Sequence, residues 1–202
     1  SSSATNTHSL SFDGVDDYVD ISVGTSDNYS FTGWMKFETA NNGNAIFAST
    51  SGDFIRIDTY NGNKYLGYNS STGANHRGTI PLSENIWYHL AVVRAGDTLE
   101  FYINGSSDGS FSEPSSSLNW TKIGIYQDGS QHPFHGLLDD FGIWNSALSQ
   151  SEIQSYMSTP PTGNETGLVG YWKFNEGTGT TAYDATSNGN DGTIYGATWS
   201  DD

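Results

Sequence analysis

Hydrophobic and polar residues alternate along much of this chain with a period of two, which is typical of half-buried β-strands. The clearest example lies within Asn85–Phe111. Residues 98–103 place Leu, Phe and Ile on one face and Thr, Glu and Tyr on the other. Asn104-Gly105 follows, and both residues accept the positive φ of a type I′ hairpin turn. Together with the residues on either side, this pattern predicts three consecutive antiparallel strands.

The first of these strands, Trp87–Arg94, is apolar on both faces. Strands of this composition lie inside a sheet that is covered on both sides. We therefore expect it to be central, with a further layer packed against each face.

Shorter runs of the same kind, separated by Gly, Asn, Asp and Ser, predict further strands. We expect them at residues 9–12, 18–23, 28–37, 45–49, 54–60, 64–68, 78–82, 120–126, 136–144, 168–174 and 193–199. One helix is expected from Ser149 to Met157, because Ser149 and Glu152 can form a capping box. Residues 69–77 and 127–135 read as long polar loops. The pattern predicts an all-β, antiparallel β-sandwich with one short helix.

The 202 residues are expected to form a single domain, 1–202, whose first eight residues resemble a linker. Residues 160–167 are an alternative boundary. The 35 residues that follow are, however, too few to bury a core alone. We therefore expect them to close the same sandwich beside the N-terminal strand.

Several stretches carry a family pattern: WYHLAVVR followed by LEFYING in the centre, and residues 9–21, 136–153 and 167–194. Together they resemble laminin G-like, concanavalin A-like jelly rolls of secreted bacterial proteins. The resemblance implies a jelly-roll fold and a role in adhesion, glycan binding or, in relatives, glycan cleavage. It does not select among these roles, because one fold serves many functions.

The amino-acid composition excludes several classes of binding partner. Seven basic and 23 acidic residues give a formal charge of −16, which argues against nucleic acid and against anionic membranes. There is no cysteine, and no apolar run is long enough to span a membrane. The aromatic content of 14% is too high for a disordered chain. We expect a monomeric module of a larger, secreted or cell-surface protein.

The sharpest metal signal is the loop from Asp184 to Gly192. Asp184, Thr186 and Asn188 stand at positions 1, 3 and 5 of a calcium-loop pattern, but position 12 is Tyr195 rather than Glu. Calcium would therefore need outside ligands, and the family resemblance implies them. The predicted structural calcium ligands are Asp139, Asp140, Asn175, Glu176, Asp184, Asn188 and Asp191. The alternative is that these residues form side chain-to-backbone turns without metal.

A second acidic group contains Asp13, Asp16, Asp17 and Asp20. It is interpreted as a solvated turn; as a calcium site, it would use Asp13 and Asp16 first. His132 and His135 offer a weak transition-metal pattern, because Pro133 separates them and no cysteine is present.

No catalytic residues are predicted. Jelly-roll glycosidases that resemble this chain carry alternating carboxylates, as E-x-D-x-E, on one strand, and retaining or inverting chemistry needs such a pair. No such string occurs here, and no Ser stands in a G-x-S-x-G elbow. We therefore expect the chain not to be an enzyme.

Glycan binding needs an exposed aromatic face beside planar polar groups. The two polar loops and their flanks supply both, and the predicted ligand-binding residues are Tyr68, Asn75, His76, Arg77, Trp120, Tyr126, Gln127, His132 and His135. Trp34, Trp87, Trp144 and Trp172 are assigned to the core. The hypothesis is a calcium-stabilised, non-catalytic carbohydrate-binding module of a bacterial adhesin or polysaccharide-degrading enzyme. The alternatives are a structural or protein-binding adhesion spacer and, less favoured, a glycoside hydrolase or lyase.

Overall fold

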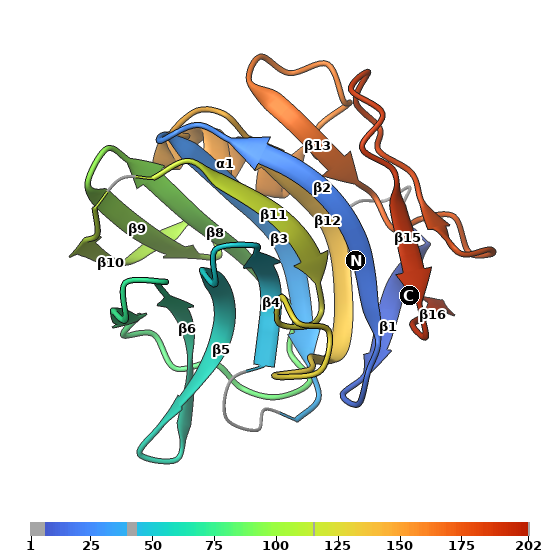
Figure 1. The fold of residues 1–202 in the computed structure, drawn as a ribbon, viewed down its shortest axis with the longest axis horizontal. Coiled ribbons are helices and arrows are strands. Elements are labelled where there is room, and N and C mark those ends of the chain that lie inside the picture. The colour runs from blue at the N-terminus through green and yellow to red at the C-terminus, as the bar shows by residue number, and fades with distance from the viewer. Residues whose placement is uncertain (1–6, 40–43, 115, 202) are drawn as a thin grey trace.

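The computed structural model describes residues 7–39, 44–114 and 116–201, which form two stacked antiparallel sheets and a helix (Figure 1). The first sheet has the order β10 (Ser106–Ser112), β9 (Thr98–Ile103), β8 (Tyr88–Ala95), β3 (Tyr29–Phe37), β12 (His135–Trp144), β1 (His8–Asp13) and β16 (Thr198–Asp201), and β13 (Leu168–Trp172) pairs with β12. The second has the order β14 (Thr181–Ala182), β15 (Gly192–Tyr195), β2 (Tyr18–Thr25), β11 (Leu118–Ile123), β4 (Asn44–Ser49), β5 (Phe54–Tyr60), β6 (Asn63–Asn69) and β7 (Asn75–Arg77). The predicted jelly-roll sandwich is confirmed.

The core lies between the two sheets and takes every second side chain of most strands. Trp120 is almost fully buried there and stacks on Phe47, with ring centroids 4.6 Å apart. Trp144 and Trp172 are buried as predicted, whereas Trp34 and Trp87 are half-buried. Among the described residues, no helix has the length and apolar character that crossing a membrane requires.

Strand β8 is central, between β9 and β3, as its two apolar faces predict. One face joins the core between the sheets. The other carries Ala91 and Val93, which form a second apolar cluster with Trp144 and with Ile153 of helix α1 (Gln150–Ser158). The capping box at Ser149 and Glu152 that starts this helix is also confirmed.

Two strand predictions are wrong. Residues 78–82 contribute only an isolated bridge from Leu82 to Lys64, because the Asp108 carboxylate accepts the backbone N–H groups of Thr79 and Ile80. The neighbouring strand is instead β7, inside the predicted polar loop 69–77.

Residues 193–199 are also not one strand. The chain turns at Gly196, whose φ is +77°, so that β15 belongs to the second sheet and β16 to the first. β15 pairs with β2 and β16 pairs with β1, which places both C-terminal strands beside N-terminal ones (Figure 1). The short strand β14 was not predicted.

Candidate functional site

The outer face of the second sheet carries charged residues around β5. Ile55 and Ile57 point into the core, so the alternating residues Arg56, Asp58 and Tyr60 face outward. In the strand register, Arg56 lies opposite Gly67 of β6, and Gly67 lies opposite Arg77 of β7. Two arginines from different strands therefore flank one glycine.

These residues line a cleft of about 380 Å³. Its walls come from β5, β7 and the loop before β12, and the lining residues are Arg56, Asp58, Thr59, Tyr60, Asn75, Arg77 and His132. Asn75 and Arg77 belong to the first predicted polar loop and His132 to the second. The tertiary structure thus brings the two polar loops together at one cleft.

Asp58 links the two arginines. One of its carboxylate oxygens lies 3.0 Å from Nη2 of Arg56, and the other lies 3.0 Å from Nη1 of Arg77. Arg56 is 7% exposed and Asp58 is 4% exposed. Burial lowers the pKa of Arg56, and the nearby Asp58 carboxylate opposes that shift. Because a guanidinium keeps its proton at neutral pH, the cleft holds two positive charges and one negative charge.

Aromatic rings lie at both ends of the cleft. The guanidinium of Arg77 lies 3.8 Å from the ring centroid of Tyr60. Tyr60 is 49% exposed to solvent. At the other end His132, with φ of 54°, stacks on Phe54 at a centroid distance of 5.6 Å. Tyr126 packs edge-on against both rings and supports them.

Gly67 keeps the cleft open between the strands. A Cβ atom at this position would lie 3.1 Å from Cβ of Asp58 and 3.5 Å from Cγ of Arg56. A larger residue would press on the two side chains that form the cleft floor.

Of the predicted ligand-binding residues, Asn75, Arg77 and His132 line the cleft, and Tyr126 packs behind it. Gln127 lies beside Tyr126, whose hydroxyl donates to the Gln127 side-chain oxygen over 3.2 Å. The sequence analysis missed Arg56, Asp58, Thr59 and Tyr60. The alternation of isoleucines with polar residues over residues 54–60 predicts a strand. The same alternation also indicates that the polar residues share the outer face of the sheet.

Four of the predicted ligand-binding residues lie elsewhere. Tyr68 and Trp120 present no face to a ligand, because both are buried in the core, where Tyr68 donates to Asp53 over 2.9 Å. His76 points away from Asn75 and Arg77 and contacts Glu113, with Nε2 and Oε2 2.7 Å apart. His135 contacts Glu38 and Thr39 and does not line the cleft.

The predicted calcium loop is held by hydrogen bonds. The Asp184 carboxylate accepts from the backbone N–H groups of Tyr171, Thr186 and Asn190, and from the Thr186 hydroxyl. Asp191 in turn accepts from the backbone N–H of Asp184. A carboxylate has about four lone-pair sites. Four donors thus contact the Asp184 carboxylate, as in the side chain-to-backbone turn that is the alternative for this loop, and its role as a calcium ligand stays a prediction.

Several of the other predicted metal ligands also make hydrogen bonds within the protein. Asn188 donates its side-chain amide to the Val169 carbonyl. Asp139 and Asp140 are buried, and the Tyr171 hydroxyl donates to Asp140 over 2.6 Å. Burial, reinforced by the nearby Asp140 charge, raises the pKa of Tyr171. Calcium binding by these seven residues stays a prediction.

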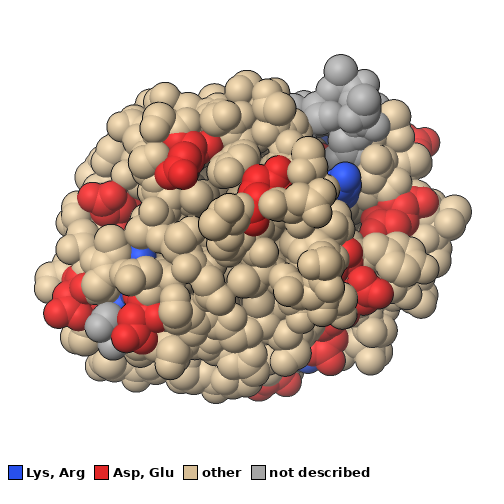
Figure 2. Space-filling view, turned by 90° about the horizontal axis from the view of Figure 1, so that it is seen from above, with Lys and Arg blue, Asp and Glu red and all other residues tan. Residues whose placement is uncertain are grey.

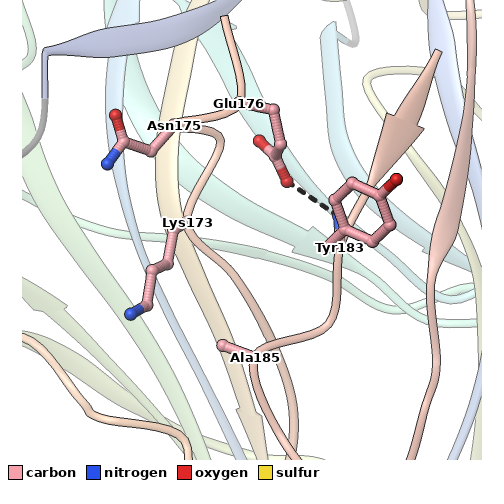
Figure 3. A pocket seen from close by; sticks show the side chains of 5 residues that line it. All are labelled: Lys173, Asn175, Glu176, Tyr183 and Ala185. Atoms are coloured by element: carbon pink, nitrogen blue, oxygen red, sulfur yellow. Dashed lines mark hydrogen bonds between the residues drawn. The ribbon is translucent and has the colours of Figure 1, made fainter. Parts of the chain in front are cut away.

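Asn175 and Glu176 line a second cleft of about 250 Å³, together with Lys173, Tyr183 and Ala185 (Figure 3). Glu176 accepts the backbone N–H of Tyr183 over 2.8 Å. Within the described ranges, the one group of three or more potential metal-ligating side chains is Asp13, Asp16 and Asp17. Burial raises the pKa of Asp17, and the neighbouring carboxylates of Asp13 and Asp16 contribute to the rise.

The surface charge is mainly acidic. Figure 2 shows acidic side chains spread over one face of the molecule, with only isolated basic ones. Two of the seven Lys and Arg residues of the chain line the β5–β7 cleft. The cleft is therefore a local exception to the overall charge of −16.

Solved structures with the same fold include a candidate carbohydrate binding protein from Bacteroides ovatus, at 21% identity and a TM-score of 0.81, aligned over 97% of this chain and 60% of that protein. A SAP-like pentraxin from Limulus polyphemus is 20% identical with a TM-score of 0.68, over 84% of this chain and 93% of the pentraxin. Domain 4 of AbnA, an extracellular arabinanase from Geobacillus stearothermophilus solved with arabinotriose, is 23% identical with a TM-score of 0.54, over 67% and 68%. At these identities the likeness shows the fold alone.

No curated protein matches this chain. A family model does match, over residues 13–154, which is well over half of the sequence. This chain therefore belongs to the concanavalin A-like lectin/glucanases superfamily.

Proposed function

We propose that this chain is a non-catalytic carbohydrate-binding module that binds a glycan in the cleft between β5, β7 and the loop before β12. The observation that carries the proposal is the convergence of Tyr60, Asn75, Arg77 and His132 in one cleft from three separate segments. An exposed aromatic ring can stack on the C–H face of a sugar, and planar amide and guanidinium groups can pair with its hydroxyls. Similar chemistry is typical of small-ligand clefts with a few placed polar groups.

The structural neighbours support the same function. One is a candidate carbohydrate binding protein, and another is a domain solved in complex with arabinotriose. This chain spans 60% of the length of the first. We therefore propose that it acts as one module of a longer, exported bacterial protein, either an adhesin or a polysaccharide-degrading enzyme.

A catalytic role has little support at this cleft. Glycoside hydrolysis by the usual mechanism needs two carboxyl groups facing the scissile bond. The residues that line the cleft include one carboxylate, that of Asp58, and both of its oxygens pair with arginines. Its lone pairs are thus directed at guanidinium groups and away from a substrate.

The proposal is tested by affinity electrophoresis against arabinan, galactan, pectin, alginate and laminarin, followed by calorimetry on oligosaccharides of any polysaccharide that retards the protein. Tyr60→Ala should weaken binding by about fivefold or more, since stacking of a nucleic-acid base on an aromatic ring contributes about 1–3 kcal/mol and a comparable amount is expected for a sugar here. Tyr195→Ala is the matched control, because Tyr195 is similarly exposed, at 46%, and lies outside the cleft.

Retention of the wild type and of Tyr195→Ala, with loss in Tyr60→Ala, would support the proposal. Equal losses in both variants would place the site elsewhere. No retention on any polysaccharide would favour the spacer role. Calcium stabilisation of the module stays a prediction.

A further inference from the structure

The two arginines of the cleft have more hydrogen-bond donors than partners. A guanidinium carries five N–H groups in a planar fork. Within the described part of the chain, Arg56 donates to Asn75 and Asp58, and Arg77 donates to Asp58. The Nε atom of Arg56 is buried and has no partner among the described residues. Most of the donor capacity on the cleft floor is therefore unused by this chain.

The charge of the cleft is also incompletely balanced. Asp58 is the one carboxylate among the lining residues, and it faces two guanidinium groups. Arg56 is 7% exposed, so water screens its charge poorly. Leaving a buried charge without a full complement of partners is unfavourable, and an incoming anion would relieve that cost.

From these donors and this charge we propose that the glycan unit bound in the cleft carries a carboxylate, and that Arg56 and Arg77 hold it. The inference rests on the proposed function and specifies its ligand class. A carboxylate matches the planar donor fork of arginine, and such charge-assisted pairs are stronger than bonds to neutral hydroxyls. The amide nitrogen of Asn75, whose oxygen accepts from Arg56, remains available for a hydroxyl of the same sugar, and Tyr60 for its apolar face.

The overall charge selects among acidic glycans. The chain carries −16, and the cleft offers a single net positive charge. A densely sulfated or fully acidic polymer would place several anions against an acidic surface, where repulsion opposes binding. A glycan with one isolated carboxylate, at a chain end or on a branch, can form the ion pair with the cleft arginines without that repulsion.

The test compares acids with their methyl esters, which differ in charge and keep the same sugar ring. Trisaccharides ending in glucuronic, galacturonic or sialic acid are each titrated by calorimetry as the acid, as the methyl ester and, for the uronates, as the matching hexose. We expect one acid to bind at least tenfold more tightly than its ester, as a charge-assisted pair predicts.

Variants then locate the preference. Arg77→Gln should abolish the acid-over-ester ratio, and Arg77→Lys should keep only part of it, because lysine retains the charge but loses the fork. Lys122→Gln is the matched control. It removes the same charge from the same face of the second sheet, where Lys122 pairs with Asp20, outside the cleft.

Equal affinity for acid and ester would overturn the inference. So would an equal change in the ratio for Arg77→Gln and Lys122→Gln, since the effect would then come from the overall charge. If neutral trisaccharides bind and Tyr60→Ala removes that binding, the proposed function stands while the carboxylate assignment fails. If no trisaccharide binds and no polysaccharide retards the protein, both fail.

Discussion

Asp184 is the residue for which the structure makes the sharpest prediction, because a metal ligand and a hydrogen-bond acceptor respond differently to the same change. Its carboxylate accepts four hydrogen bonds, at donor–acceptor distances of 2.7–3.0 Å. One of these bonds joins the loop before β15 to Tyr171 of β13, and the other three hold the loop itself. Removing the carboxylate should therefore loosen the contact between two segments of the sandwich.

The size of the effect follows from those bonds. A hydrogen bond to a charged group contributes about 1.5–3 kcal/mol, but bonds to one shared acceptor do not add fully. Asp184 is half-buried, so water can replace part of what is lost. We expect Asp184→Ala to lower the free energy of unfolding by about 2–4 kcal/mol, and Asp184→Asn by about half of that, because the amide keeps one acceptor oxygen.

The assay is urea denaturation followed by tryptophan fluorescence, with and without EDTA. Asp27→Asn is the control, because it removes the same charge at an exposed position. In a chain of net charge −16, removing one negative charge should by itself stabilise slightly, so a loss in Asp184→Asn reports on the hydrogen bonds. The reasoning is refuted if Asp184→Ala costs less than about 1 kcal/mol. It is also refuted if EDTA destabilises the wild type but leaves Asp184→Ala unchanged, since the residue would then act through a metal.

Three further predictions address other parts of the molecule. Calcium, if bound as the sequence predicts, should raise the melting temperature of the protein, and EDTA should lower it. A melting temperature that changes with neither calcium nor EDTA would count against a bound calcium ion. Asp16→Asn tests whether Asp13, Asp16 and Asp17 hold that ion. Burial lowers the pKa of His89 from 6.5 to about 4, so between these pH values the unfolded chain binds a proton that the folded chain does not. The free energy of unfolding should therefore fall by up to about 3 kcal/mol as the pH drops from 6.5 to 4. His89→Gln should remove this part of the pH dependence, and an identical pH profile for the variant would contradict the assignment. Gly67→Val should weaken glycan binding severalfold, measured by calorimetry, because the new side chain would displace Asp58 and Arg56. Gly24→Val should leave binding unchanged, because a Cβ atom there has no neighbour within 4 Å. Equal binding by the two variants would show that Gly67 has no role in the cleft.

The strand pattern was largely readable from the sequence because it depends on local alternation. Residues 98–103 are a strand at the predicted bounds, and the predicted capping box starts the helix. One strand error came from a turn at Gly196, which sends β15 and β16 to different sheets, and the other came from a distant side chain. Residues 78–82 are not a strand because Asp108, about thirty residues further along the chain, takes their backbone N–H groups.

The candidate site was readable only in part. Sequence alone identified the two polar loops, and three of its residues, Asn75, Arg77 and His132, do line the cleft. It also assigned Tyr68 and Trp120 to ligand binding, because residue type does not tell which side of a strand faces the core. Arg56 and Asp58 were missed because charged residues are common on the exposed face of a strand. Their place in a cleft becomes visible only when the neighbouring strands are known.

The sequence by itself determined the fold class, the position of the helix and the acidic character of this module, since these follow from periodicity, capping and composition. Only the tertiary structure decided that Arg56, Asp58 and Arg77 share one cleft, and that the Asp184 carboxylate accepts a hydrogen bond from the backbone of Tyr171 in β13. The physical reason is that sheet register and strand order set these distances. Residues 56 and 77 lie on either side of Gly67 because β6 pairs with both of their strands, and no local pattern encodes that pairing.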